Sequence, residues 1–164
     1  MTGGMLTLVP FSDGFLDQVV SWPRAAAELR WWFGLTGVET TDHELFRRWQ
    51  AEDDNDAYLL LDGERPVAYG ELWHEPGEVE LAHLMVDPAR QRQGLGIRLV
   101  QDLTGLAAQE PGTDVFLRVQ PDNGVAIGCY LRAGYERLSA EEETEFNAGQ
   151  PLAYAWMRPG SADS

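Results

Sequence analysis

The stretch from Val79 to Ala108, VELAHLMVDPARQRQGLGIRLVQDLTGLAA, decides the fold of this chain. It opens with a largely apolar run, Val79 to Val86, whose length and content are typical of a buried strand. Asp87-Pro88 ends that strand, and the glycine-rich segment QRQGLG follows. After Gly96, apolar residues recur at helical spacing. The sequence therefore predicts a strand, a glycine turn and an amphipathic helix in direct succession.

The two glycines of the turn, Gly94 and Gly96, favour an anion site. Glycine has no Cβ, so the backbone can bend sharply, and the first N–H groups of the next helix stay unpaired at the positive end of its dipole. Such a site most often binds phosphate. A nucleotide P-loop is a poor match because no Gly-Lys-Ser/Thr occurs, and a dinucleotide fingerprint is another because Leu99 stands where its third glycine belongs.

The composition predicts one globular domain. The chain has 164 residues and a net charge of −15, which disfavours nucleic acid and anionic membranes as partners. That acidity favours cationic small molecules or basic peptides, but it also serves solubility alone, and both interpretations stay open. No apolar run approaches a membrane span, and the first residues lack the pattern of a signal peptide, so we expect a soluble cytoplasmic protein. The single cysteine, Cys129, excludes an internal disulfide.

Strands and helices are predicted on both sides of the central stretch. An N-terminal strand and three helical segments precede a hairpin, and a strand, a short helix and a final pair of strands follow the central helix. The acidic segment Glu141 to Glu145 is expected to separate that final pair. The expected strands are Leu6–Val9, Ala57–Leu61, Val67–Trp73, Thr113–Val119, Tyr135–Leu138 and Leu152–Met157, and the expected helices end near Ser21, span Ala25–Phe33, follow Thr41-Asp42 and span Asn123–Ala133.

A second motif lies beyond the central helix. The segment from Asn123 to Tyr135, NGVAIGCYLRAGY, reads as a capped helix with a glycine stop. It resembles motif B of the GCN5-related N-acetyltransferase (GNAT) family, and Gln91-x-x-Gly94-x-Gly96 resembles motif A of the same family. The two motifs stand in the family's order and at a similar separation. Together they cover roughly Val79 to Leu138.

The resemblance implies an α/β fold with a mixed, twisted central sheet whose central strands splay apart, flanked by helices on both faces. It implies a single domain over residues 1–158, followed by a tail at 159–164 that we expect to fray. Members of this family often form dimers, so a homodimer is one assembly that the resemblance allows.

The resemblance also implies acetyl-CoA as the co-substrate and no metal. The splayed strand would pair with the pantetheine arm, the turn and the next amide would bind the pyrophosphate, and the motif B helix would contact the arm and the sulfur. The implied cofactor-binding residues are Leu84, Met85, Val86, Gln91, Arg92, Gln93, Gly94, Leu95, Gly96, Ile97, Asn123 and Tyr130. The three histidines show no metal-ligand spacing.

Acetyl transfer to an amine needs a base for the ammonium proton and an acid for the departing thiolate. The resemblance places Tyr130 as the acid and Glu80 at the position of the catalytic glutamate, with Glu71 and His83 in reserve. A carboxylate buried in an apolar strand is costly unless it takes part in catalysis or is paired, and an outward-facing strand residue is the equally weighted alternative for Glu80. Ribosomal-protein N-terminal acetyltransferases usually carry a glutamate where this chain has Arg118, which argues against that branch.

The acceptor is expected to be a small-molecule or peptide amine. In this family the first helices form the acceptor wall, so Glu28, Trp31 and Trp32 are candidate acceptor-binding residues, together with Glu71 and His83. Core packing is the stronger account for at least half of the N-terminal aromatic residues. Two alternative functions remain: transfer of a longer acyl group, and a CoA-binding sensor without catalysis.

Overall fold

The computed structural model describes residues 5–23 and 43–160, which form a seven-stranded sheet. The strand order is β1-β2-β3-β4-β5-β7-β6. All neighbouring strands are antiparallel except β4 and β5, which run parallel in the middle of the sheet. The strands are β1 (Leu6–Pro10), β2 (Asn55–Asp62), β3 (Arg65–Glu75), β4 (Glu78–Val86), β5 (Asp114–Val119), β6 (Tyr135–Arg137) and β7 (Ala155–Pro159).

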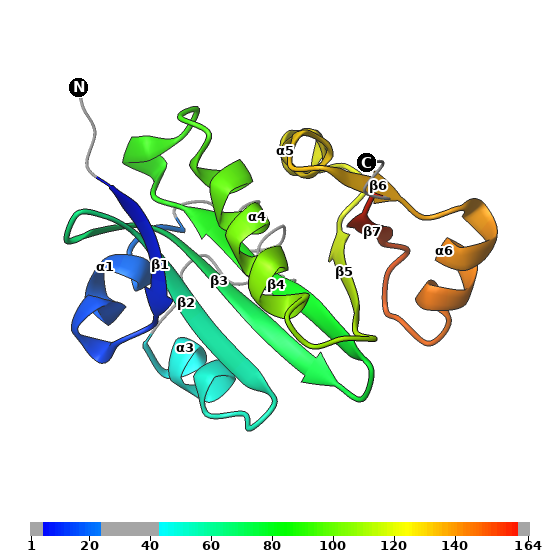
Figure 1. Ribbon diagram of the computed structural model, residues 1–164, viewed down its shortest axis with the longest axis horizontal. Helices are drawn as coiled ribbons and strands as arrows, with labels where there is room; N and C mark the ends of the chain where they lie inside the picture. Colours follow the sequence, from blue (N-terminus) through cyan, green and yellow to red (C-terminus); the bar gives the residue numbers. More distant parts are fainter. Residues whose placement is uncertain (1–4, 24–42, 161–164) are drawn as a thin grey trace.

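Helices connect and cover the strands (Figure 1). The predicted central helix is present as α4, and it joins the two parallel strands, as parallel pairing requires a crossover. The helices are α1 (Leu16–Val20), α3 (His43–Gln50), α4 (Leu95–Ala107), α5 (Gly124–Arg132) and α6 (Ala140–Asn147), with short 3-10 turns at Asp13–Phe15 and Pro88–Arg90.

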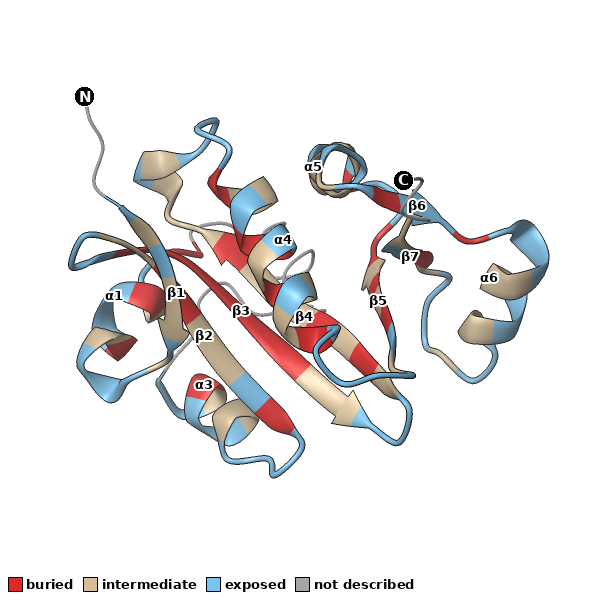
Figure 2. Cartoon of the chain, viewed as in Figure 1, coloured by how far each residue is buried: buried red, intermediate tan, exposed pale blue. Residues whose placement is uncertain are grey.

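Core clusters lie on both faces of the central strands, and β3 is buried over most of its length (Figure 2). Successive side chains of a strand point to opposite faces, so Ala68 and Leu72 pack with α4 while Tyr69 packs with α1 and α3. Leu81 and Met85 of β4 also lie on opposite faces, although they are four residues apart, because the register between β3 and β4 shifts between them. This confirms the expected mixed sheet with helices on both faces.

The C-terminal third differs from the sequence prediction. The acidic segment expected to lie between two strands is helix α6, which begins with a capping box formed by Ser139 and Glu142. Strand β7 begins at Ala155 rather than at position 152, and it extends to Pro159. The Gly160 amide then donates to the carbonyl of Gly134 over 2.8 Å.

Several expectations lie outside the described residues: the helix at 25–33, the cap at 41–42 and the last four residues of the chain. None of the helices within residues 5–23 and 43–160 has both the length and the apolar character that crossing a membrane requires.

Candidate active site

The two central strands part over the second half of β4. The ladder between β4 and β5 pairs Glu78 with Asp114 at one end and Leu81 with Leu117 at the other, and it stops there. Strand β4 continues to Val86, while β5 turns to pair with β7. The two strands diverge beyond this point (Figure 1). In the described part of the chain, the β5-facing edge of β4 therefore has no strand partner from Ala82 onward, and its backbone groups can pair with an extended ligand.

A β-bulge lies in this exposed half of β4. Tyr69 pairs with Met85 and Glu71 with Ala82, so Gly70 alone is opposite both His83 and Leu84. His83 has φ +52, a left-handed conformation that is uncommon for a side-chain-bearing residue. Bulges turn side chains and backbone groups away from their regular directions and often lie beside active sites. The sequence prediction placed the pantetheine contacts at this bulge and just beyond it, at Leu84, Met85 and Val86.

The glycine turn leads directly into α4. Gly94 is the N-cap of the helix with φ +75, and Arg92 before it has φ +66. The first helical bond is from the Arg98 amide to the Gly94 carbonyl, so the amides of Leu95, Gly96 and Ile97 precede the helical ladder. Gln91, Arg92 and Gln93 are exposed. The turn thus presents unpaired N–H groups at the positive end of a 13-residue helix.

Two of the arginines near this turn are paired with carboxylates. Arg90 pairs with Asp62 over 2.8 Å and also donates to Gln93, and Arg98 donates to Asp102 on the next turn of α4. Their charges are therefore largely neutralised. The positive character of the turn comes mainly from backbone amides, with Arg92 as the exposed arginine at its centre.

Helix α5 packs beside the start of α4. Its N-cap is Asn123, whose side chain accepts from the Ala126 amide over 3.2 Å. A Cβ placed on Gly96 would lie 3.1 Å from Cys129 Sγ and 3.7 Å from Val86 Cγ2. The absent side chain of Gly96 thus permits the close approach of α4, α5 and β4, which brings the two motifs together.

Tyr130 lies on α5, packed against the core on the α4 side of the sheet. Burial raises the pKa of its phenol, with smaller contributions from Cys129 and Tyr135. The hydroxyl forms no hydrogen bond with another residue in the described ranges. Tyr130 therefore keeps its proton across the physiological pH range and has its donor available.

Glu80 is paired with Arg118 rather than isolated. The Arg118 Nε and Nη2 atoms donate to its two carboxylate oxygens over 2.7 and 2.9 Å, across the parallel pair of strands. Arg118 also donates to Gln150, and its guanidinium lies 4.8 Å from the Trp156 ring centroid. This bidentate ion pair accounts for a carboxylate at this place in the strand, so the position of Glu80 gives no separate sign of a catalytic base.

Glu71 is fully buried at the centre of a hydrogen-bond network. Its carboxylate accepts from the Tyr69 hydroxyl, from Trp73 Nε1 over 2.8 Å, and is bonded to His83 Nδ1 over 2.6 Å. Burial and the Glu71 charge raise the pKa of Tyr69, which keeps that phenol a donor. Gln50 donates to the Tyr69 hydroxyl in turn. The network fixes the orientation of a histidine on the bulge.

His83 itself is positioned by an aromatic ring as well as by Glu71. Its ring stacks on Trp49 of α3 with centroids 3.8 Å apart and planes 20° apart. The histidine side chain retains 17% exposure. The structure thus brings Glu71 and His83 together and places Glu80 in a separate ion pair, and the acceptor candidates Glu28, Trp31 and Trp32 lie outside the described residues.

Sequence reasoning missed the partners of Glu71. Tyr69, Glu71 and Trp73 alternate along one strand, and the period of two places all three on one face. That alternation was a usable signal. The stacking of Trp49 on His83 had no signal in the sequence, because it joins residues of α3 and β4 that only the tertiary fold brings together.

Comparison with known proteins agrees with this geometry. A model of the acetyltransferase (GNAT) family matches residues 22–135. The aminoglycoside N(6')-acetyltransferase type 1 of Klebsiella pneumoniae is 25% identical over 149 residues, which cover 80% of this chain and 74% of that enzyme. The solved structure of aminoglycoside acetyltransferase AAC(6')-Ib with coenzyme A and kanamycin has a TM-score of 0.72 at 20% identity, covering 96% of this chain and 95% of the other. That likeness shows a shared fold.

A shorter match involves a different kind of acetyltransferase. The N-alpha-acetyltransferase RimI of Mycobacterium tuberculosis is 38% identical over 63 residues, which span only 38% of each chain. The prediction drawn from Arg118 about that branch stays a prediction. The family match, by contrast, runs through the parted strands, the glycine turn and the helix of Tyr130. The chain belongs to the acetyltransferase (GNAT) family.

Proposed function

We propose that this protein transfers the acetyl group of acetyl-CoA to a primary amine by direct attack, without a covalent enzyme intermediate. The observation that carries the proposal is the parting of β4 from β5 directly beside the unpaired amides that begin α4. An extended, amide-bearing chain ending in a pyrophosphate matches both features. Coenzyme A has this chemistry, and a related fold has been solved with coenzyme A bound.

The cofactor would be held mainly by the backbone. The amides of Leu95, Gly96 and Ile97 would bind the pyrophosphate, with Gln91, Arg92 and Gln93 at the exposed rim and Gly94 forming the turn. The backbone of Leu84, Met85 and Val86 would pair with the pantetheine arm, and Asn123 would contact it from the start of α5. This arrangement explains how a chain of net charge −15 could bind an anion: the site depends on local dipoles rather than on the overall field.

The reaction forms a bond between the amine nitrogen and the acetyl carbon and breaks the thioester C–S bond. A backbone N–H of the bulged strand would polarise the carbonyl as charge develops on its oxygen. Tyr130 would give its proton to the departing thiolate. Burial raises the pKa of Tyr130, so its hydroxyl stays protonated at neutral pH and is available to donate to the departing thiolate.

The base is assigned to His83, oriented by Glu71. With the Nδ1 proton donated to the Glu71 carboxylate, the second ring nitrogen is the basic one. An alkylamine with a pKa near about 10 is mostly protonated at neutral pH, so this nitrogen, directly or through water, would take its proton. Glu80 is the less favourable candidate because both of its oxygens accept from Arg118.

Thiol release with acetyl-CoA and a panel of primary amines tests the proposed function. Acetylation of any amine in the panel, with release of one thiol for each acetyl group transferred, is the expected result. Turnover with longer acyl-CoA donors alone would assign the acyl-transfer alternative. Tight CoA binding with no transfer to any amine would favour the sensor alternative and contradict catalysis.

A matched pair of histidine variants tests the base. His83→Asn should lower kcat strongly with little change in CoA affinity, while His74→Asn, which affects an exposed histidine paired with Asp56, should retain the wild-type kcat. Glu80→Gln should lower kcat much less than His83→Asn. A wild-type kcat in the His83 variant, or a larger loss in the Glu80 variant, would return the base role to Glu80.

A further inference from the structure

A cavity of about 310 Å³ lies on the face of the sheet opposite α4. It sits beside the hairpin that joins β3 to β4 and extends toward α6 and β7. Its lining residues on β3, β4 and β5 alternate with core residues that face α4, which places them on the opposite face. Aromatic rings form much of its wall: Trp73, Phe116, Phe146 and Trp156.

Acidic side chains occupy the end of the cavity near the hairpin. Glu75 and Glu78 both line it and are directly opposite each other on β3 and β4. On the other side of Glu78, β5 places Asp114 in the same cross-strand row. Like charges directly opposite are destabilising. None of the ion pairs formed within residues 5–23 and 43–160 involves these three carboxylates.

The basic residue of the lining does not offset these charges. Among the described residues of the cavity wall, Arg118 is the one cation, and its guanidinium is bound to both oxygens of Glu80. Glu75 and Glu78 thus remain uncompensated beside a wall of rings. Carboxylates next to aromatic faces suit an alkylammonium group, which gains ionic and cation–π attraction there.

The cavity adjoins the proposed reaction centre. Trp73 lines the cavity, and its Nε1 donates to Glu71, the residue that orients His83. Along β4, His83 is three residues from Glu80 and five from Glu78, which at about 3.3 Å per residue is roughly 10 to 17 Å. This is the span of an extended aliphatic chain rather than of a single small amine.

We propose that the cavity binds a second cationic group of the acceptor, so that the preferred acceptors are extended amines with charged nitrogens about 10 to 17 Å apart. The proposal rests on the acetyl transfer proposed above, because it uses the position of the reacting amine. It assigns Glu75, Glu78 and Phe146 to acceptor recognition.

A length series tests the spacing. The probes are α,ω-diaminoalkanes with four to ten methylenes and the n-alkylamines in which a methyl group replaces the distal ammonium. Each is titrated calorimetrically into the full-length protein, with and without CoA, and each is assayed for kcat/KM. An extended diamine with eight methylenes spans about 11 Å between its nitrogens. We expect diamines of this length or more to bind about fivefold or more tightly than their matched alkylamines, and shorter diamines to show no such preference.

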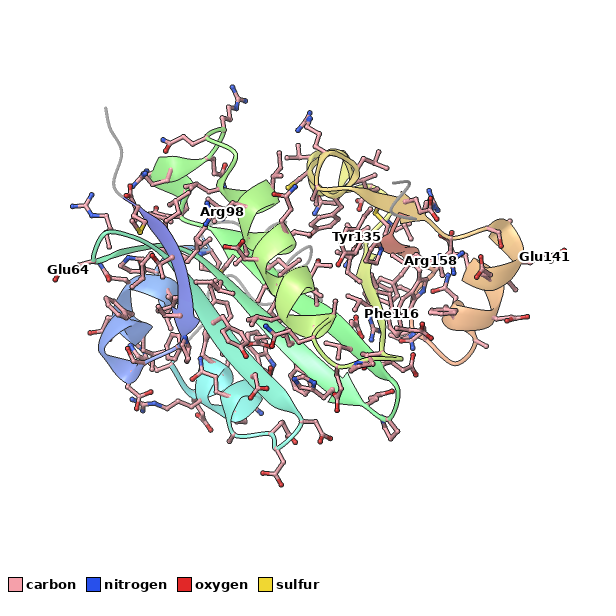
Figure 3. The ribbon with its side chains drawn as sticks, in the orientation of Figure 1. Glu64, Arg98, Phe116, Tyr135, Glu141 and Arg158 are labelled. Carbon is pink, nitrogen blue, oxygen red and sulfur yellow. The ribbon has the colours of Figure 1, made fainter. Side chains whose placement is uncertain are left out.

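Variants of the cavity test the residues. The double variant Glu75→Gln with Glu78→Gln should abolish the preference for diamines, and Phe146→Leu, which keeps an apolar side chain of similar reach, should weaken it. The control is Glu64→Gln, in an exposed turn at the far side of the molecule from Phe116 (Figure 3), which should retain the full preference. The readout is the ratio of diamine to alkylamine affinity, which a general loss of stability would not change selectively.

Two results would overturn the proposal: diamines that bind no better than alkylamines at any length, or a preference that survives in the double glutamine variant. Because binding is measured without turnover, these results are separate from a failure of the proposed function. That failure would appear as absent acetyl-CoA binding or absent transfer, whatever the amine.

Discussion

The contact between Gly96 and Cys129 yields the sharpest structural prediction. A Cβ at position 96 would lie 3.1 Å from Cys129 Sγ, closer than ordinary van der Waals contact. Valine adds two further methyl groups beside it, with Val86 Cγ2 only 3.7 Å from the Cβ position. Gly96→Val therefore has to push α5 away from α4, and overpacking of this kind costs about 1 to 3 kcal/mol.

A glycine of the same helix supplies the control. A Cβ on Gly105 would have no atom within 4 Å, and the residue is exposed in the interior of α4. Gly105→Ala should therefore stabilise the protein by about 0.5 to 1 kcal/mol through helix propensity. In thermal unfolding at about 2 to 4 °C per kcal/mol for a chain of this size, Gly96→Val should lower Tm by roughly 2 to 12 °C, and the control should raise it slightly.

A double-mutant cycle identifies the cause. Cys129→Ala removes the Sγ atom that the new side chain would meet, so it should be less destabilising in the Gly96→Val protein than in the wild type. Because α5 carries Asn123 and Tyr130, Gly96→Val should also weaken acetyl-CoA binding in calorimetry, and Gly105→Ala should not. Additive effects of the two substitutions on the free energy of unfolding, within about 0.5 kcal/mol, would refute the packing argument.

Three further predictions concern the turn, the acid and pH. Gly94→Glu should abolish acetyl-CoA binding in calorimetry, since it places negative charge at the anion site. Gly63→Glu, at an exposed glycine with a similar φ of +64, should only lower Tm. Equal losses of binding in the two variants would argue against the turn as the anion site. Tyr130→Phe should lower kcat by about 100-fold with little change in CoA affinity. Because burial raises the pKa of Tyr130, the wild-type rate should show no decline from phenol ionisation up to about pH 10. The hydrogen bonds from Arg137 lower the pKa of Glu143. This pair therefore stabilises the fold fully above the ordinary carboxyl pKa, and the contribution is lost as the pH falls through the lowered pKa. The Tm of Glu143→Gln should accordingly fall less on acidification than the wild-type Tm.

The central part of the fold was predictable because its signals are local. The apolar run of β4, the glycine turn and the spacing of α4 each depend on residues close together in sequence, and the structure places them as expected. Helix α6 also had a local signal, the capping box of Ser139 and Glu142, but its acidic composition was interpreted as a loop.

The details of the site depended on contacts that sequence does not show. The sequence leaves a catalytic, a paired and an outward-facing Glu80 all open, because its partner Arg118 lies on another strand, 38 residues away along the chain. The bulge at His83 arises from the register of β3 against β4, which no single segment encodes. Gly96 was interpreted as an approach point for phosphate, and the structure adds a packing role against α5.

The measurement that tests the central claim most directly is calorimetric titration of the protein with acetyl-CoA, followed by thiol release with amine acceptors, on the wild type and on Gly94→Glu. We predict saturable binding and transfer to an amine for the wild type and neither for the folded variant. Absence of acetyl-CoA binding to the wild-type protein, or unchanged binding by the variant, would contradict the assignment of the parted strands and the glycine turn as the cofactor site.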